Sequence, residues 1–259
     1  MFADTDTAPP AAPDRPGRRT AAPWVLMYHS VHEFTDPAED PYGITVTPRT
    51  LDAQLGWLRS RGLHGVSVGE LRRARKAGRG AGLVGLTFDD GYTDFLTQAL
   101  PLLQRHGCTA TLFVLPGRLG VDNVWDPLGP RKPLLSAEGI RSAAGAGMEI
   151  GSHGLVHRHL TTCADDELRQ ELRGSRELLR ELTGRLPEGF CYPYGSFDRR
   201  VLTAARAAGY HYACAIVPGR LSGPYAMPRT HVSQADGPGR LRVKRLRHQV
   251  RELSRTVFP

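Results

Sequence analysis

The sequence has no long apolar run and contains little lysine or cysteine. No stretch of its 259 residues approaches the about 18 consecutive apolar residues of a transmembrane helix. The first residues include Asp4 and Asp6 and lack the apolar core of a secretory signal peptide. We therefore expect a cytoplasmic protein, or one that acts outside the cytoplasm if the start of the chain is misassigned.

The four cysteines are few for a chain of this length and are widely separated. Cys108, Cys163, Cys191 and Cys214 form no C-x-x-C pair. A chain of this size can bury a sufficient apolar core without disulfide cross-links. We therefore expect four reduced thiols rather than a disulfide framework.

Arginine supplies nearly all of the positive charge. Lys76, Lys132 and Lys244 are the only lysines among 34 basic residues, and the formal net charge is +8. The skew towards arginine, alanine, glycine and proline is typical of a composition bias of a whole genome, so charge alone does not indicate a nucleic-acid partner. We expect no nucleic-acid partner, although a basic surface attracts anionic polymers and membranes.

Composition divides the chain into three parts. Residues 1–22 are rich in proline and alanine without an apolar period, which predicts a disordered leader. Residues 23–235 carry regular apolar patterns and are expected to form one domain, and residues 236–259 a basic C-terminal helix or tail. That helix has an apolar face and could make a peripheral contact with an acidic surface; we expect a monomer. Its apolar residues are Leu241, Val243, Leu246, Val250 and Leu253.

Short apolar runs alternate with helical patterns from residue 24 onwards. This order predicts an α/β fold with a parallel sheet, either open or closed into a barrel. Active groups collect at the carboxyl ends of the strands in both arrangements. We expect strands over 24–28, 64–68, 83–88, 109–115, 148–150, 190–192, 210–216 and 226–232, and helices over 93–106, 137–146, 165–182, 199–208 and 240–256.

Two motifs at expected strand ends carry metal-binding side chains. Asp89 and Asp90 follow one strand, and His153-x-x-x-His157 follows another. One carboxylate and two imidazoles make an open site for a divalent cation, whether the histidines lie on a helical turn or in a compact loop. Each motif alone has an ordinary explanation, a helix cap or a chance pair. A zinc protease is disfavoured, because Gly154 stands where that chemistry requires glutamate.

Taken together, the motifs resemble those of a known family. The segments Thr87–Gly91, His153-x-x-x-His157 and Tyr192–Gly195 occur in the order and spacing of the polysaccharide deacetylases, the NodB-homology enzymes of carbohydrate esterase family 4. The resemblance covers about residues 24–232. It implies an irregular (β/α) barrel that uses a divalent metal, usually zinc, to remove acetyl groups from amino sugars or glycans.

The resemblance also implies roles for individual residues. Asp89 would be the general base, and Asp90, His153 and His157 would bind the metal. Tyr194 would supply a backbone N–H to the oxyanion.

One position departs from the family pattern. Many members carry an arginine that pairs with the base, but here that position is Cys191. Arg229 could replace it from a neighbouring strand, and we group Arg229 with Tyr194 as a substrate- or oxyanion-binding residue.

Two histidines compete for the role of general acid. Met27–Val31 resembles the N-terminal strand motif of the subfamily that deacetylates poly-N-acetylglucosamine, in which a histidine of that motif is the acid. We favour His29 over His231 because His29 directly follows an expected strand. The sequence therefore predicts a metal-dependent carbohydrate deacetylase acting on an acetylated amino sugar or glycan. The alternative is a catalytically inactive, glycan-binding protein of the same fold.

Overall fold

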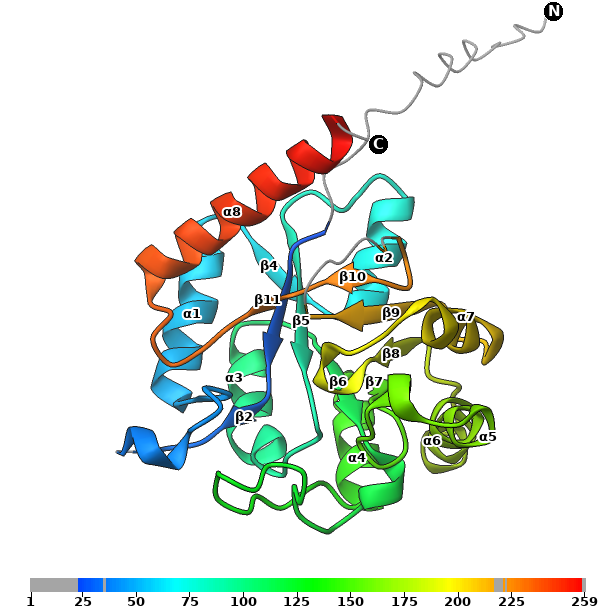
Figure 1. Ribbon diagram of the computed structural model, residues 1–259. Helices are drawn as coiled ribbons and strands as arrows, with labels where there is room; N and C mark the ends of the chain where they lie inside the picture. Colours follow the sequence, from blue (N-terminus) through cyan, green and yellow to red (C-terminus); the bar gives the residue numbers. More distant parts are fainter. Residues whose placement is uncertain (1–22, 35, 217–220, 222, 258–259) are drawn as a thin grey trace, which may run out of the picture.

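Short buried strands alternate with helices along the chain, as the spacing of the apolar runs predicts. The computed structural model describes residues 23–34, 36–216, 221 and 223–257 (Figure 1). The leader expected over residues 1–22 lies outside the described residues. The main sheet contains β1 (Val25–Tyr28), β4 (His64–Val66), β5 (Leu83–Phe88), β6 (Thr111–Val114), β7 (Glu149–Ser152), β8 (Gly189–Cys191), β9 (Tyr212–Ala215), β10 (Met227–Pro228) and β11 (Thr230–His231).

The main sheet is parallel and nearly closes on itself. Its strand order is β10-β9-β8-β7-β6-β5-β1-β11, and β4 pairs with the first half of β5. The two ends of this order are consecutive in the sequence, because β10 pairs with β9 while β11 pairs with β1. We expected one strand over 226–232; the chain instead forms two short strands that flank Arg229. This segment closes the irregular (β/α) barrel.

Large aromatic side chains fill the barrel opposite glycines. Phe113 and Tyr212 belong to an inner cluster of buried side chains with Cys191, Cys214 and Met227. A Cβ atom on Gly151 would lie 2.5 Å from the Phe113 ring, and one on Gly189 would lie 2.3 Å from the Tyr212 ring. These glycines are therefore required by close packing inside the barrel.

Helices surround the barrel, and several begin where the sequence supplies a cap. The side chains of Thr47, Ser67, Ser136 and Asp198 each accept a hydrogen bond from a backbone N–H in the first turn of the following helix. The α-helices are α1 (Pro48–Ser60), α2 (Val68–Lys76), α3 (Leu100–Arg105), α4 (Ala137–Gly145), α5 (Asp165–Arg169), α6 (Ser175–Thr183), α7 (Arg199–Ala207) and α8 (Pro238–Val257).

Two expected helices contain turns of π-helix. The helix predicted over 93–106 is a π-helical turn, Phe95–Ala99, followed by α3. The helix predicted over 165–182 is interrupted by a second one, Gln170–Gly174, between α5 and α6. Such turns insert an extra residue and so change which side chains face inwards.

The remaining short elements lie around the carboxyl ends of the strands. β2 (Ser30–Val31) pairs with β3 (Thr45–Val46), close to the end of β1. Turns of 3-10 helix cover Pro37–Glu39, Pro116–Arg118, Leu160–Thr162 and Pro193–Gly195. At the other end of the chain, α8 packs against α1, and its Leu241 is completely buried in the largest core cluster. The four cysteines are buried and form no disulfide.

Candidate active site

The carboxylates of Asp89 and Asp90 point to different places because the backbone turns sharply after β5. Asp90 has a φ of 71° and Gly91 a φ of 74°, both in the left-handed region. A Cβ atom at position 91 would lie 2.9 Å from Val114 Cγ1, so both space and backbone conformation require glycine there. Asp89 and Asp90 are only 2% and 4% exposed, so each carboxylate must find partners within the protein.

Arg229 is the partner of Asp89. Its Nη1 donates to Asp89 Oδ1 at 2.6 Å and its Nη2 to Asp89 Oδ2 at 2.7 Å, a bidentate and fully buried ion pair. Cys191 Sγ lies 2.9 Å from Arg229 Nη2 and 3.5 Å from Asp89 Oδ2. Arg229, between β10 and β11, thus makes with Asp89 the pairing that was expected of the arginine missing at position 191.

This ion pair sets the protonation state of Asp89. Burial alone would raise the pKa of its carboxyl, but the charge and hydrogen bonds of Arg229 outweigh burial and hold the pKa below its usual range. Asp89 is therefore ionised at neutral pH and able to accept a proton.

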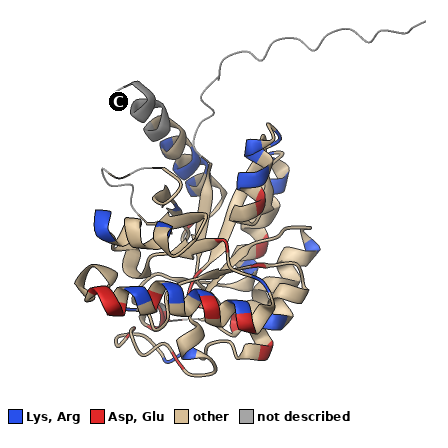
Figure 2. Cartoon of the chain, turned by 90° about the vertical axis from the view of Figure 1, so that its right-hand side faces the viewer, with Lys and Arg blue, Asp and Glu red and all other residues tan. Residues whose placement is uncertain are grey.

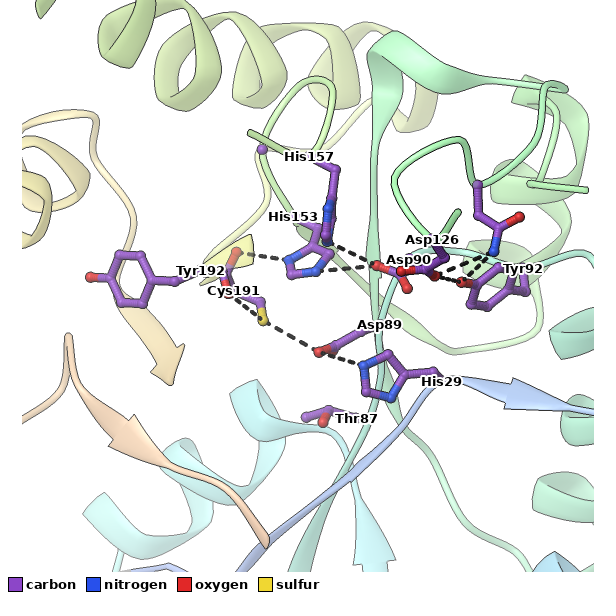
Figure 3. A network of polar contacts seen from close by, with 12 residues as sticks. His29, Thr87, Asp89, Asp90, Tyr92, Asp126, His153, His157, Cys191 and Tyr192 are labelled. Atoms are coloured by element: carbon purple, nitrogen blue, oxygen red, sulfur yellow. Dashed lines mark hydrogen bonds and ion pairs between the residues drawn. The ribbon is translucent and has the colours of Figure 1, made fainter. Parts of the chain in front are cut away.

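Asp90, His153 and His157 converge on one point (Figure 3). Asp90 Oδ1 lies 3.3 Å from His153 Nε2 and 3.5 Å from His157 Nε2. Two ligand atoms of a tetrahedral zinc ion are about 3.3 Å apart, given zinc–ligand distances near 2.0–2.1 Å. Asp90 Oδ1 has no hydrogen-bond partner among the described residues although it is buried. The three residues therefore fit a divalent cation.

The site moves the pKa values of its two histidines in opposite directions. Burial would lower the pKa of His153, but the neighbouring Cys191 and Asp90 outweigh burial and raise it well above its usual value. His153 Nδ1 donates to the backbone oxygen of Cys191 at 2.9 Å, which orients the ring, and a bound cation would take the place of the proton on Nε2. Burial lowers the pKa of His157 to about 3, so this imidazole is neutral at physiological pH. Burial would raise the pKa of Asp90, but the neighbouring imidazoles of His153 and His157 hold it well below its usual range.

A second set of possible ligands is less suited to a cation. Asp89, His153 and Cys191 also offer atoms within 4.8 Å of one another. Arg229, however, pairs with Asp89 and contacts Cys191 Sγ, so its positive charge lies where this cation would bind. The set that contains Asp90 is the better site.

Glu171 holds the loop from His153 to His157 through hydrogen bonds to the loop backbone. Its Oε2 accepts hydrogen bonds from the backbone N–H groups of Leu155 at 2.6 Å and Val156 at 3.2 Å. Glu171 is 3% exposed and belongs to the π-helical turn between α5 and α6. A Cβ atom on Gly154, whose φ is 86°, would lie 2.8 Å from Glu171 Oε2. The two histidines thus approach each other in a compact loop and not on a helical turn.

Aromatic rings enclose His157. Its imidazole is stacked on Trp125, with ring centroids 4.5 Å apart, and meets the edge of Tyr194 at 4.4 Å. Tyr194 in turn stacks on His159 at 3.8 Å. Tyr194 has a φ of 57° in the turn after β8 and remains 41% exposed, so it borders the opening of the site.

The long loop over residues 116–135 supplies Trp125 and is fixed at its base. Leu135 N donates to the backbone oxygen of Gly91 at 2.8 Å. Lys132 Nζ donates to Ser30 Oγ at 2.9 Å and to Thr45 Oγ1 at 2.6 Å, which ties the loop to β2 and β3. A half-buried lysine with two side-chain acceptors is well suited to hold a loop in one position.

The two candidate acids lie next to each other, and His29 is the one that contacts Asp89. His29 Nε2 is 3.9 Å from Asp89 Oδ2, and its side chain is 14% exposed (Figure 3). The ring of His231 meets the His29 ring at 6.4 Å in an edge-on arrangement. Burial, reinforced by the neighbouring charges of His29 and Lys244, lowers the pKa of His231.

Sequence reasoning missed two carboxylates at the site. Glu171 was counted as part of an amphipathic helix, although its position beside Leu168 and Leu172 on the apolar face is a signal of burial. Asp126 follows Trp125 and accepts a hydrogen bond from the Tyr92 hydroxyl at 3.2 Å. Burial and the nearby charge of Asp90 raise the pKa of Asp126, and no sequence spacing indicates that these two acids are neighbours.

We predict that Glu171→Ala lowers the affinity for zinc about 10- to 100-fold, because the loop that carries His153 and His157 loses its support. Isothermal titration calorimetry measures this affinity directly. Glu171→Gln is the matched control, since its amide oxygen can still accept from Leu155 and Val156. Zinc binding by Glu171→Ala at the wild-type affinity would contradict the role assigned to Glu171.

Comparisons with known proteins show which family the chain resembles. The model of the polysaccharide deacetylase family matches residues 76–213. YxkH of Bacillus subtilis (strain 168), provisionally named a polysaccharide deacetylase, is 28% identical over 216 residues, which are 81% of this chain and 71% of YxkH. The poly-beta-1,6-N-acetyl-D-glucosamine N-deacetylase of Escherichia coli (strain K12) is 35% identical over 96 residues, which are 35% of this chain and 14% of that protein.

A solved structure has the same fold. The deacetylase PplD of Streptococcus pyogenes, determined in complex with acetate, superposes with a TM-score of 0.74 at 23% identity, over 87% of this chain and 98% of PplD. This likeness confirms the expected irregular (β/α) barrel. Because the family model matches more than half of the chain, the chain belongs to the polysaccharide deacetylase family.

Proposed function

We propose that this protein hydrolyses the acetyl groups of N-acetylated amino sugars or glycans with the help of a divalent cation, most suitably zinc. The observation that carries the proposal is the convergence of Asp90, His153 and His157, with the ionised Asp89 beside them. Two imidazoles and one carboxylate are a donor set that suits zinc and leaves positions for water and substrate.

Each residue of the site has a separate role in the hydrolysis. A divalent cation held by Asp90, His153 and His157 would lower the pKa of the attacking water and polarise the acetyl carbonyl. When the oxygen of that water attacks the acetyl carbon, Asp89 accepts the proton that the water loses. The N–H of Tyr194 donates to the oxyanion that develops on the carbonyl oxygen. Arg229 keeps Asp89 ionised and oriented, and thus acts as a positioning residue.

His29 is the general acid in this proposal. When the carbon–nitrogen bond breaks, the amine leaves with an electron pair and requires a proton. His29 lies at the end of β1, beside Asp89 and partly open to solvent, so it can reach the leaving nitrogen. The products are acetate and the amino sugar. The proton taken up by Asp89 balances the one that His29 gives, and the second proton of the water passes from the new carboxyl group through solvent to the amine, which leaves as ammonium.

The comparisons support a glycan as the substrate. The Escherichia coli relative acts on poly-beta-1,6-N-acetyl-D-glucosamine, as its name states, and the Met27–Val31 motif points to the same subfamily. We therefore propose oligomers of N-acetylglucosamine as the first substrates to test, with β-1,6- and β-1,4-linked oligomers, the monosaccharide and an O-acetylated sugar compared in parallel. Release of acetate, measured with and without added zinc, is the readout.

Asp89→Asn should reduce acetate release at least about 100-fold while zinc remains bound. The variant should also lose about 3–5 kcal/mol of stability, because Arg229 is left buried without its counter-charge. The double variant Asp89→Asn, Arg229→Met removes both charges, so it should regain stability without regaining activity. Thermal unfolding and acetate assays on both variants separate the two effects.

Two results would contradict the role of Asp89. The first is acetate release by Asp89→Asn at a rate near that of the wild type. The second is recovery of activity in the more stable double variant, which would show that the single change acts through folding. Wild-type protein that binds zinc and oligosaccharide but releases no acetate from any of these sugars would instead be an inactive glycan-binding protein.

His29→Asn should lower the kcat for an N-acetylated sugar at least about tenfold. It should have a much smaller effect on 4-nitrophenyl acetate, because that leaving group departs without a proton. His231→Asn is the matched control and should alter both rates little. If His231→Asn produced the selective loss and His29→Asn did not, the general acid would be His231.

A further inference from the structure

The C-terminal helix α8 exposes an apolar stripe on the side that faces away from the barrel. Val243, Leu246 and Val250 are 46%, 51% and 61% exposed, whereas Leu241 is completely buried. At 3.6 residues per turn the three exposed residues fall within an arc of about 60°, centred about opposite to Leu241. The barrel therefore buries Leu241 and leaves the stripe on the other side of α8 uncovered to the extent of these exposures.

Arginines border this stripe on both flanks. Arg242 lies on one side of it, and Arg240 and Arg247 lie on the other, all three exposed. The sequence from residue 238 to residue 250 contains no aspartate or glutamate. Figure 2 shows basic residues along α8, in contrast to the mixed charges of the helices lower in that view. An apolar stripe between rows of arginine is typical of a helix that lies in the interface of an anionic membrane.

Two cavities beside α8 add to this positive surface. One, of about 320 Å³, is lined by Arg61, Arg242 and Arg245 together with Leu246. The other, of about 310 Å³, is lined by Arg75, Arg245 and His248. None of the described residues that line either cavity is acidic. Both are open hollows, and the N–H groups of Arg61, Arg242 and Arg245 can donate to phosphate oxygens.

The position of α8 leaves the active site open. The cavity at Arg245 and His248 is also lined by Trp24 and Leu83, at the amino ends of β1 and β5. The catalytic side chains lie at the opposite, carboxyl ends of these strands, after Tyr28 and Phe88. A surface bound to α8 would therefore not block the entry of a glycan.

We propose that α8 docks the protein onto a membrane surface rich in anionic lipids. Val243 and Leu246 enter the boundary between headgroups and acyl chains, and the flanking arginines bind lipid phosphates. None of the helices in the described part of the chain is both long and apolar enough to span a bilayer, so the contact is peripheral. A nucleic acid could bind the arginines through its phosphates but would leave the apolar stripe exposed to water. A lipid surface accommodates both features.

Sedimentation with vesicles tests the proposal on the full-length protein. We expect binding to vesicles of phosphatidylcholine mixed with phosphatidylglycerol, and little binding to phosphatidylcholine alone. Leu246→Asp should weaken binding at least about tenfold through the loss of apolar burial. Replacing Arg242 and Arg247 with glutamine should weaken it about fivefold for each arginine.

Matched controls separate docking from general effects. Leu178→Asp makes the same change at a leucine of α6 that is 39% exposed, and should bind vesicles like the wild type. Arg199→Gln, Arg206→Gln is the charge control on α7. All α8 variants should keep the thermal stability and the rate of acetate release from a soluble oligomer, so failure here is independent of the proposed reaction.

Three results would overturn the proposal. One is the absence of binding to the anionic vesicles. Another is vesicle binding by Leu246→Asp at the wild-type affinity, which would show that surface charge alone makes the contact. The third is tighter binding to duplex DNA than to vesicles at the same salt concentration, which would assign the arginines to a nucleic acid.

Discussion

The buried ion pair between Asp89 and Arg229 connects the closure of the barrel with the chemistry of the site. Arg229 lies between β10 and β11, so its backbone is held on one side by β9 and on the other by β1. Its guanidinium reaches across to Asp89 at the end of β5. Because neither charge reaches water, each requires the other. The closing segment is thereby fixed, and with it the orientation of the Asp89 carboxylate.

The pair also explains why Asp90 faces elsewhere. Asp89 is committed to Arg229, and the left-handed backbone at Asp90 directs the second carboxylate towards His153 and His157. Asp90, His157 and Tyr194 are the non-glycine residues with positive φ among the described residues, and all three lie at this site. Each such conformation costs about 1–3 kcal/mol and persists only where its surroundings hold it. Around His157 that support comes from Glu171 and from the rings of Trp125 and Tyr194.

Strand ends and motif residues were predictable because they follow local rules. Apolar runs set the strands, and the positions of Asp89, Asp90, His153 and His157 relative to those runs place them at one edge of a parallel sheet. The strand positions need only the order of residues along the chain. The missing arginine at Cys191, and Arg229 as its possible replacement, were inferred from the resemblance to the family pattern.

The remaining features depend on contacts between distant segments. The split of residues 226–232 into two strands arises because their neighbours, β9 and β1, are set by closure of the whole barrel. Glu171 lies in a π-helical turn that conforms to the loop it supports. The apolar pattern of the sequence predicts a continuous helix there and does not indicate this turn. Asp126 reaches Tyr92 because Lys132 and Leu135 anchor a long loop at two places. The spacing of residues along the sequence does not predict these contacts.

Everything chemical in this account requires one cation between Asp90, His153 and His157. Crystals of the protein grown with zinc, with anomalous diffraction recorded at the zinc absorption edge, locate that cation directly. The account predicts one anomalous peak about 2.0–2.2 Å from a carboxylate oxygen of Asp90 and from Nε2 of both histidines, with Asp89 still paired to Arg229. A peak on Asp89, His153 and Cys191, or no peak at these residues, would contradict it.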